Sequence, residues 1–295
     1  MITDFHQVRH ITILGVGLIG GSLGLALKAK RFQGKITGLG RRMSTLEIAI
    51  ERGAVDVATT DFEVGLRDAD VLIICTPVDL IPAMVESVVA IRATDPKPLL
   101  ISDVGSVKRK ILEDSESFFT AQKLEHLHFI GSHPMAGSHE SGVVAARANL
   151  FEGAKCIVTP TEQTDAQALQ IIMGFWEYLG AELYLLSPAE HDVLIAGASH
   201  FPHLIASILA NTAGDIPRAL DFAGTGFRDT TRIAAGSPEL WTGIFRQNAD
   251  ALTSMIDAFI ENLTQFKIEL ENQNADALAR ILTQAKILRE SLEHK

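Results

Sequence analysis

The chain has 295 residues, of which 47% are hydrophobic and 21% are charged, and its net charge is −10. This length suits two domains, and the composition is that of a soluble globular enzyme. The negative charge argues against nucleic acid as a partner, because no long basic stripe offsets it. We also expect no membrane contact, since we see no apolar run that approaches the ~20 residues of a membrane span.

The ends of the chain and its cysteines bear on the cellular compartment. The first residues have neither the basic start nor the apolar core of a signal peptide, which predicts a cytoplasmic protein. Cys75 and Cys156 both lie in apolar, strand-like segments. This placement favours reduced, buried thiols over a disulfide or a zinc site.

The first predicted strand, residues 11–14, leads directly into a GxGxxG sequence. Gly15 permits a tight turn, Gly17 lets backbone N–H groups approach a pyrophosphate, and Gly20 lets the following helix pack closely on the strand. The positive end of that helix then faces the phosphates. The predicted cofactor-binding residues in this segment are Gly15, Gly17, Leu18, Ile19 and Gly20.

Apolar strand-like runs alternate with helical stretches from residue 11 to about residue 186. This alternation is typical of a Rossmann-type, doubly wound parallel sheet, so the predicted class of this half is α/β. A capping box of Ser44 and Glu47, with Gly53 as a stop, predicts a helix over residues 45–52. The predicted strands are residues 11–14, 35–39, 71–75, 99–102, 128–130, 156–159 and 182–186.

A strong helix start at Ser187, Pro188 and Glu190 marks the point beyond which strand-like runs disappear. We therefore predict a dinucleotide-binding domain over residues 1–187 and an all-helical domain over residues 188–295. Its main helices are predicted at residues 189–212, 238–246, 248–272 and 275–292. Because so many of these helices are apolar, we expect some of them to pack against a second copy of the chain as a homodimer.

Three polar segments follow predicted strands, at the edge where a doubly wound sheet binds its ligand. They are Thr76–Pro77, residues 103–106 and residues 131–137. The third holds His133, which is followed by a proline and flanked by glycines that would admit a ligand. A histidine placed there is a candidate for acid-base chemistry beside a bound cofactor.

Five motifs, taken together, resemble the prephenate/arogenate dehydrogenase family of tyrosine biosynthesis. They are GVGLIGGS at 15–22, SDVGSVK at 102–108, GSHPMAG at 131–137, HDVLIAGASHFPH at 191–203 and GFRDTTRIA at 226–234. The resemblance implies oxidative decarboxylation of prephenate, or alternatively arogenate, with hydride transfer to NAD(P)⁺. The hydroxyl that becomes a carbonyl must lose its proton, so the reaction needs a base.

The resemblance also implies roles for single residues. His133 is the expected base, and Ser106 is expected to hydrogen-bond near it and near the nicotinamide. Arg232 is expected to bind a substrate carboxylate, with Asp229 orienting it. Without the motif, these two residues would be interpreted as a surface ion pair. The remaining expected substrate contacts are His203, Trp241 and His139, whereas His191 and His200 are interpreted as structural and no metal is expected.

The residues after the second strand bear on the choice of cofactor. NAD-binding domains usually carry an acid there, but this chain has Gly40 followed by Arg41 and Arg42. Guanidinium groups can pair with a 2′-phosphate, so we expect NADP to be favoured over NAD, with Arg41, Arg42, Thr76 and Pro77 among the cofactor contacts. His139 stands where several relatives carry an acid, which favours prephenate over arogenate as substrate.

Two other functions fit the sequence less well. A hydroxyacid dehydrogenase of the Rossmann-plus-helical type should use a lysine in the helical half, but none lies between Pro188 and Gln265. A nucleotide-sensing protein could dispense with His133, Ser106 and Arg232, but this chain has all three. Feedback by tyrosine, in a chain that ends at Lys295, is expected to be competitive at the active site.

Overall fold

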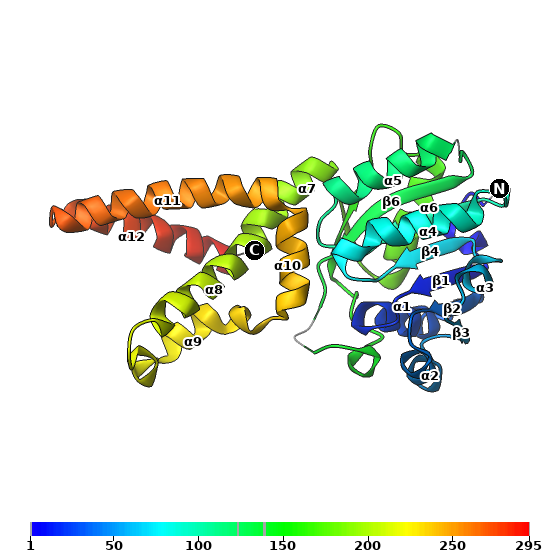
Figure 1. The fold of residues 1–295 in the computed structure, drawn as a ribbon, viewed down its shortest axis with the longest axis horizontal. Coiled ribbons are helices and arrows are strands. Elements are labelled where there is room, and N and C mark those ends of the chain that lie inside the picture. The colour runs from blue at the N-terminus through cyan, green and yellow to red at the C-terminus, as the bar shows by residue number, and fades with distance from the viewer. Residues whose placement is uncertain (1, 123, 138–139, 295) are drawn as a thin grey trace. The chain divides into compact units, whose positions relative to one another are not determined.

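The computed structural model describes residues 2–122, 124–137 and 140–294. The chain divides into two compact units, Met1–Asn248 and Ala249–Lys295. The first contains a sheet with helices on both of its faces, followed by further helices (Figure 1). The second is a pair of helices, α11 (Ala249–Glu271) and α12 (Ala275–Glu290). The predicted division near Ser187 stays a prediction.

The sheet has eight strands in the order β3-β2-β1-β4-β5-β6-β7-β8. All neighbouring strands are parallel except β6 and β7, which pair in antiparallel register. The doubly wound, Rossmann-type class is therefore confirmed. The strands are β1 (His10–Leu14), β2 (Lys35–Leu39), β3 (Val57–Thr59), β4 (Val71–Ile74), β5 (Leu99–Asp103), β6 (Leu127–Pro134), β7 (Lys155–Thr159) and β8 (Glu182–Leu185).

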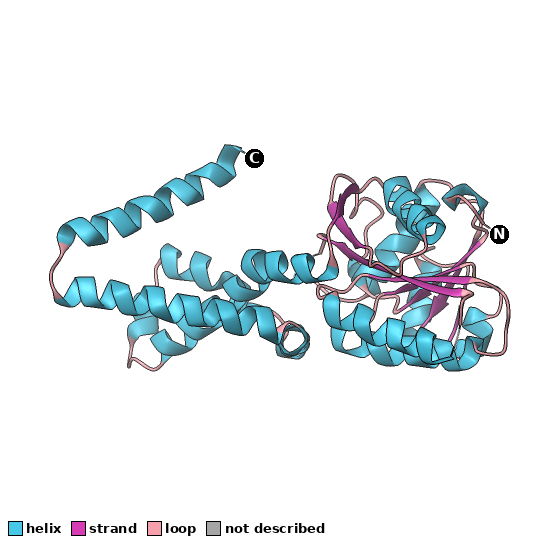
Figure 2. Cartoon of the chain, turned by 90° about the horizontal axis from the view of Figure 1, so that it is seen from above, coloured by secondary structure: helices cyan, strands magenta, loops and turns pink. Residues whose placement is uncertain are grey.

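Helices cover both faces of the sheet (Figure 2) because the strand side chains alternate between two apolar cores. In β4, Val71 and Ile73 face one core, and Leu72 and Ile74 face the other. The first core takes in α1, α2 and α6, and the second takes in α3, α4 and α5. These helices are α1 (Leu18–Ala29), α2 (Met43–Glu51), α3 (Phe62–Leu66), α4 (Ile81–Arg92), α5 (Arg109–Gln122) and α6 (Ala166–Leu179).

Two sequence predictions in this half need correction. The strand predicted at residues 128–130 continues to Pro134, because antiparallel pairing with β7 extends it, so His133 lies inside β6 and not in a following loop. The capping box at Ser44 was also wrong, since α2 begins at Met43 and the cap residue Arg42 makes no side-chain cap bond. The short β3 was not predicted.

The first helix after the sheet begins at the predicted place, but the helix predicted over residues 189–212 is interrupted. The Ser187 hydroxyl accepts a hydrogen bond from the backbone N–H of Glu190 at 3.2 Å, which caps α7 (Pro188–Ile195). A π-helical turn, η4 (Ala196–His200), joins α7 to α8 (Phe201–Gly214), directly before Pro202. The chain continues through α9 (Thr225–Thr231), the 3₁₀ turn η6 (Arg232–Ala235) and α10 (Pro238–Gln247).

One helical stretch changes the expectation about membranes. By length and composition, Pro188–Gly214 is apolar enough to cross a membrane, so the statement that no apolar run approaches this length was wrong. A core helix of a soluble protein passes the same test. Here His191, His200 and His203 are all buried within the first unit, which gives this stretch a packed polar side.

Candidate active site

The glycine-rich turn between β1 and α1 leaves an open space at the start of a helix. Gly15 has φ +95°, and a Cβ at this position would lie 2.9 Å from the carbonyl carbon and oxygen of Cys75. A Cβ at Gly20 would lie 2.3 Å from the Gly15 oxygen, whereas one at Gly17 would meet nothing within 4 Å. Gly17 caps α1 without a side-chain hydrogen bond. The first turn of α1, including Leu18 and Ile19, is therefore open to an anion.

Other residues at the same edge also fit a dinucleotide. Thr76 follows β4, and its buried Oγ1 has no hydrogen-bond partner among the described residues. Pro77, which follows it, is exposed. Arg41 and Arg42 are exposed beyond the end of β2. A buried hydroxyl without a partner and a helix start without a cap are both groups that a pyrophosphate-containing cofactor could satisfy.

His133 lies near the end of β6, at the edge of the sheet to which β1 also brings the glycine-rich turn. Its side chain is 8% exposed. Its Nδ1 is 2.9 Å from Nε2 of His191, which comes from α7. The Nδ1 of His191 is in turn 2.8 Å from Oδ1 of Asp192. The structure thus places a histidine, a second histidine and a carboxylate in one hydrogen-bonded row.

Asp192 is held by a second helix. Its Oδ1 accepts a hydrogen bond from the backbone N–H of Lys108 at 2.7 Å, and its Oδ2 accepts one from that of Arg109 at 3.0 Å. Both donors lie at the start of α5. Asn248 donates to the Asp192 carbonyl at 2.9 Å, and its amide nitrogen is 3.1 Å from Nδ1 of His200.

Lys108, whose backbone N–H binds Asp192, also belongs to a buried ion pair. The side chains of Lys108 and Asp103 are both fully buried and paired. The Lys108 ammonium also donates to the Ser132 carbonyl at 3.0 Å, and Asp103 accepts backbone N–H bonds from Gly105 at 2.8 Å and Ser132 at 3.2 Å. These bonds tie the loop after β5 to the residue preceding His133.

These surroundings keep the histidines neutral. Burial lowers the pKa of His133 well below its ordinary value, and His191, Lys108 and His200 lower it further. Burial also lowers the pKa of His191, although Asp192 opposes that shift, and it lowers the pKa of His200 to about 4. A neutral His133 has one ring nitrogen with a free lone pair, as a general base requires.

The structure brings some of the other predicted residues together. The rings of His203 and Trp241 stack with centroids 3.5 Å apart and planes inclined by 14°. Arg232 begins η6, which packs against α8, the helix that carries His203. Arg232 and Asp229 are exposed, and Ser106 is half-buried in the loop after β5. His139 lies outside the described residues.

Sequence reasoning missed the contact made by His191. It interpreted His191 as structural and expected Ser106 to orient the His133 ring, yet the ring of His191 lies against that of His133 with centroids 5.1 Å apart. The pair is separated by 58 positions. The adjacent His191 and Asp192, both polar in an apolar helix, were the available signal.

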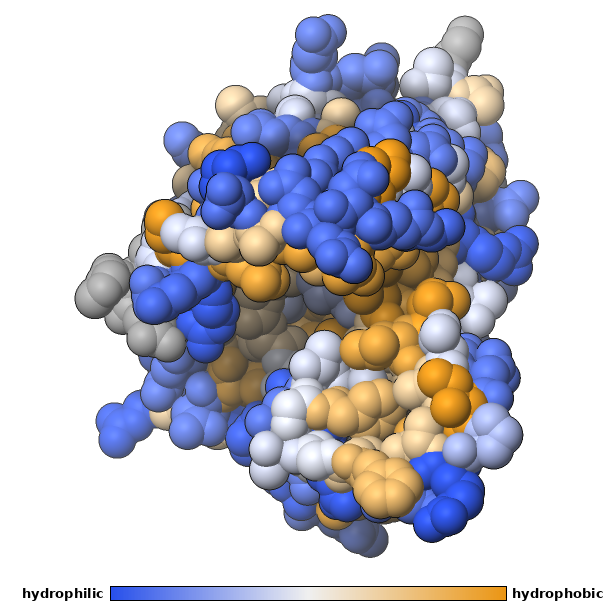
Figure 3. Space-filling model, turned by 90° about the vertical axis from the view of Figure 1, so that its left-hand side faces the viewer, coloured by the Kyte–Doolittle hydropathy of each residue, from blue (hydrophilic) through white to orange (hydrophobic). Residues whose placement is uncertain are grey.

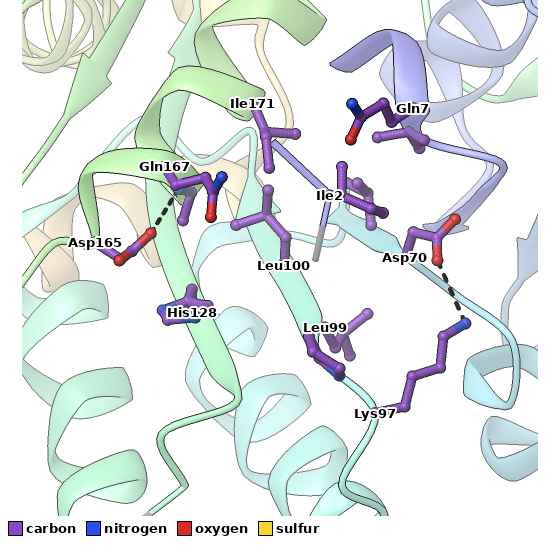
Figure 4. Close-up of a pocket in the computed structure, with 14 residues that line it drawn as sticks. Ile2, Gln7, Asp70, Lys97, Leu99, Leu100, His128, Asp165, Gln167 and Ile171 are labelled. Carbon is purple, nitrogen blue, oxygen red and sulfur yellow. Dashed lines mark hydrogen bonds and ion pairs between the residues drawn. The ribbon is translucent and has the colours of Figure 1, made fainter. Parts of the chain in front are cut away.

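A cavity of about 420 Å³ lies at the opposite, amino-terminal edge of the sheet (Figure 4). It is lined in part by Asp70 and Leu99, where β4 and β5 begin, and by His128 near the start of β6. Lys97 at its rim pairs with Asp70, with Nζ 3.4 Å from Oδ1. None of the predicted site residues is among the described residues that line it, so this cavity is separate from the candidate active site.

Two family models cover most of the chain. The nucleotide-binding domain of prephenate dehydrogenase matches residues 23–185, and the dimerization domain of prephenate dehydrogenase matches residues 187–284. Among curated proteins, the chain is 35% identical to the prephenate dehydrogenase of Bacillus subtilis over 96% of this chain and 76% of that one. It is 32% identical to the cyclohexadienyl dehydrogenase of Zymomonas mobilis over 92% and 91% of the two chains.

Solved structures give the same result. The prephenate dehydrogenase of Aquifex aeolicus, in complex with hydroxyphenyl propionate and NAD⁺, matches with a TM-score of 0.87 and 31% identity, over 97% of this chain and 99% of that one. The arogenate dehydrogenase of Synechocystis matches with a TM-score of 0.81 and 33% identity, over 96% and 100% of the two chains. The five motifs, the fold and these matches agree, and the chain belongs to the prephenate dehydrogenase family.

Proposed function

We propose that this protein is an NAD(P)-dependent prephenate dehydrogenase of tyrosine biosynthesis. The observation that carries the proposal is the position of His133, which is buried, has a lowered pKa and lies at the same sheet edge as the open turn at Gly17. The names of the curated relatives above refer to prephenate or to cyclohexadienyl compounds as substrates. Prephenate and NAD(P)⁺ would give 4-hydroxyphenylpyruvate, CO₂ and NAD(P)H.

The reaction requires one general base from the protein. A nicotinamide cofactor held at the glycine-rich turn would supply the acceptor for the hydride of the substrate's carbinol carbon. His133 takes the hydroxyl proton as the carbonyl forms. The ring carboxylate then leaves as CO₂, and its bonding electrons make the ring aromatic, which leaves a phenolate oxygen. His133 can return the proton to that oxygen, so the atoms and charges balance without a net release of protons.

The substrate carries two carboxylates, which need cations or donors inside an apolar pocket. In this proposal Arg232 binds one of them, with Asp229 orienting the guanidinium group. His203 and Trp241 form a stacked pair that faces the substrate side chain. Ser106 is proposed to hydrogen-bond near His133 and the nicotinamide, and a substrate contact of His139 stays a prediction from the sequence.

The proposed cofactor is NADP in preference to NAD. The support is the pair of exposed guanidinium groups, Arg41 and Arg42, that follows Gly40 where an acid would bind the ribose hydroxyls of NAD. The proposed contacts to the phosphates are Gly15, Gly17, Leu18, Ile19 and Gly20, and Thr76 and Pro77 are proposed to contact the cofactor from the end of β4. The Aquifex aeolicus structure holds NAD⁺, so this preference needs a direct test.

We also propose a cytoplasmic homodimer that forms through residues 188–295, with residues 1–187 as the nucleotide-binding domain. The second family model carries the word dimerization in its description. Large apolar side chains are open to solvent on these helices (Figure 3), as expected of a surface that a second copy covers. They include Val193, Leu194, Ile208, Ile260, Leu263, Leu282, Ile287 and Leu288.

The test is a matrix of two substrates and two cofactors. The purified protein is assayed with prephenate or arogenate, each with NAD⁺ or NADP⁺, by following reduced nicotinamide. We expect the highest kcat/KM with prephenate and NADP⁺. Strict dependence on arogenate would reassign the substrate within the family, and no turnover in any of the four combinations would overturn the proposed function.

A further inference from the structure

His133 is the end of a three-member row whose other members have no role in the proposed chemistry so far. The His133 Nδ1 and the His191 Nε2 are 2.9 Å apart, and the His191 Nδ1 and the Asp192 Oδ1 are 2.8 Å apart. All three side chains are buried, with His191 at 0% and Asp192 at 4% exposure. The inference below rests on the proposed function, since it concerns the same base.

The donor and acceptor capacity of each group determines where the protons of this row lie. The Asp192 carboxylate already accepts two backbone N–H bonds, from Lys108 and Arg109, and an ionised carboxylate can only accept. The proton between Asp192 and His191 therefore belongs to His191 Nδ1. A neutral His191 then has a lone pair on Nε2, so the proton between the two rings belongs to His133 Nδ1.

We propose that His191 and Asp192 are positioning residues that hold His133 in its Nδ1-protonated tautomer, so that its Nε2 offers a lone pair to the substrate hydroxyl. The same row serves the charged state. When His133 has taken the proton, its Nδ1–H still donates to His191, and the positive charge lies on a row that ends in a carboxylate. The Nδ1 proton can also shift to His191, which puts the charge directly beside Asp192.

The charges around the row show why this anion matters. Burial and the Lys108 ammonium both oppose a positive charge on His133. The Asp103 carboxylate is paired with Lys108 and bonded to two backbone N–H groups, so its charge is already engaged. Asp192 is the carboxylate that the hydrogen-bonded row connects to His133, and it acts on the charged ring through His191.

Asp192 also has a plain structural role, because it caps the start of α5 through Lys108 and Arg109. The variants must separate the two roles. Asp192→Asn keeps one carboxyl oxygen and removes the negative charge. Both the Lys108 N–H and His191 Nδ1 meet Oδ1, so an oxygen at that position keeps the main cap bond and the tautomer of the row, and only the charge is lost.

The first test reads the tautomer without substrate or cofactor. Histidine ¹⁵N spectra of the whole protein report which ring nitrogen carries a proton, and the His133 signals are assigned by their loss in His133→Asn. We expect Nδ1–H and a bare Nε2 in the wild type and in Asp192→Asn, and a mixture of the two tautomers in His191→Leu, which removes the acceptor of the Nδ1 proton. A wild-type His133 protonated on Nε2 would overturn the proposal, whatever the activity assay shows.

The second test is kinetic. Asp192→Asn should lower kcat by roughly 10- to 100-fold, because the charged row loses the carboxylate at its end, with cofactor Kd unchanged. His191→Leu should lower kcat by about 10- to 100-fold, within the range of a weakened base, and His191→Gln should restore most of it because its Oε1 can accept from His133 Nδ1. Neither change should raise KM in proportion.

His10→Gln is the matched control, since His10 is also a buried histidine bonded to a side chain, with Nε2 2.7 Å from the Thr37 hydroxyl, but it lies at the start of β1. It should keep the wild-type kcat. Circular dichroism checks that each variant folds. Wild-type turnover with an inactive His133→Asn, combined with a normal kcat in both His191→Leu and Asp192→Asn, would reject the row while leaving the proposed function intact.

Discussion

His203 and Trp241 stack face to face, and Gly236 lies against the contact of their rings. A Cβ at Gly236 would lie 2.5 Å from Nε1 of Trp241 and 2.9 Å from Cε1 of His203. The absence of a side chain at this position is therefore what lets the two rings lie flat on each other. This stack joins α8 and α10, which come from separate parts of the helical segment.

Gly236→Ala should disturb this stack and weaken substrate binding. Pushing either ring out of its rotamer costs about 0.5–1.5 kcal/mol, so kcat/KM for prephenate should fall by up to about tenfold, mainly through KM. Steady-state kinetics measure this. Gly214→Ala is the control, since a Cβ there meets nothing within 4 Å. Equal kinetics for the two variants would show that the stack does not shape the pocket.

His133→Asn removes the proposed base from β6. We expect kcat to fall by roughly 10²- to 10⁴-fold, because this is the usual contribution of a general base. The glycine-rich turn is untouched, so the Kd for NADP⁺, measured by fluorescence or calorimetry, should stay at the wild-type value. A nearly normal rate in this variant would assign the proton transfer to another group.

Alanine at Gly20 and alanine at Gly17, in the same turn, should change different properties of the protein. Gly20→Ala places a methyl group 2.3 Å from the Gly15 oxygen, and overpacking of this kind costs about 1–3 kcal/mol of folding free energy. Gly17→Ala has room in the protein and should keep the wild-type Tm. It should nevertheless weaken NADP⁺ binding, because the methyl group occupies the space left for the pyrophosphate. Unchanged NADP⁺ binding in Gly17→Ala would contradict the proposed role of this turn in binding the pyrophosphate.

Replacing Arg41 and Arg42 by serine tests the cofactor preference. A charge-assisted hydrogen bond contributes about 1.5–3 kcal/mol, so kcat/KM with NADP⁺ should fall by roughly 10- to 100-fold. The value with NAD⁺ should change little, because NAD⁺ has no 2′-phosphate. A wild-type enzyme that clearly prefers NAD⁺ would show the inference from these arginines to be wrong.

The buried histidines predict a loss of stability in mild acid. The folded protein lowers the pKa of His133, His191 and His200 below the ordinary value of about 6.5, so the unfolded chain takes up protons first as the pH falls. Their contribution to the free energy of unfolding is complete above pH ~6.5. It declines below that pH, by at most about 1.4 kcal/mol per pH unit for each histidine. Urea unfolding between pH 8 and pH 5 measures the trend, and a flat midpoint across this range would contradict it.

Local patterns in the sequence determined most of the elements. The glycine spacing after residue 14 identified the turn between β1 and α1, and the cap at Ser187 identified the start of α7, since each depends on a few adjacent residues. The capping box at Ser44 was wrong because α2 begins at Met43, two residues before the predicted start. The short β3 carries too few residues for a period to be read.

Tertiary structure decided the surroundings of the base. The sequence singled out His133 from its neighbours, but the extension of β6 through that residue depends on antiparallel pairing with β7. The contact with His191 depends on how α7 returns to the sheet, and no local period encodes a pair 58 positions apart. Side-chain hydrogen bonds and pKa shifts arise from such long-range packing, whereas turns and caps arise from neighbours along the chain. The sequence alone therefore located the candidate base, and the fold determined which residues orient it and keep it neutral.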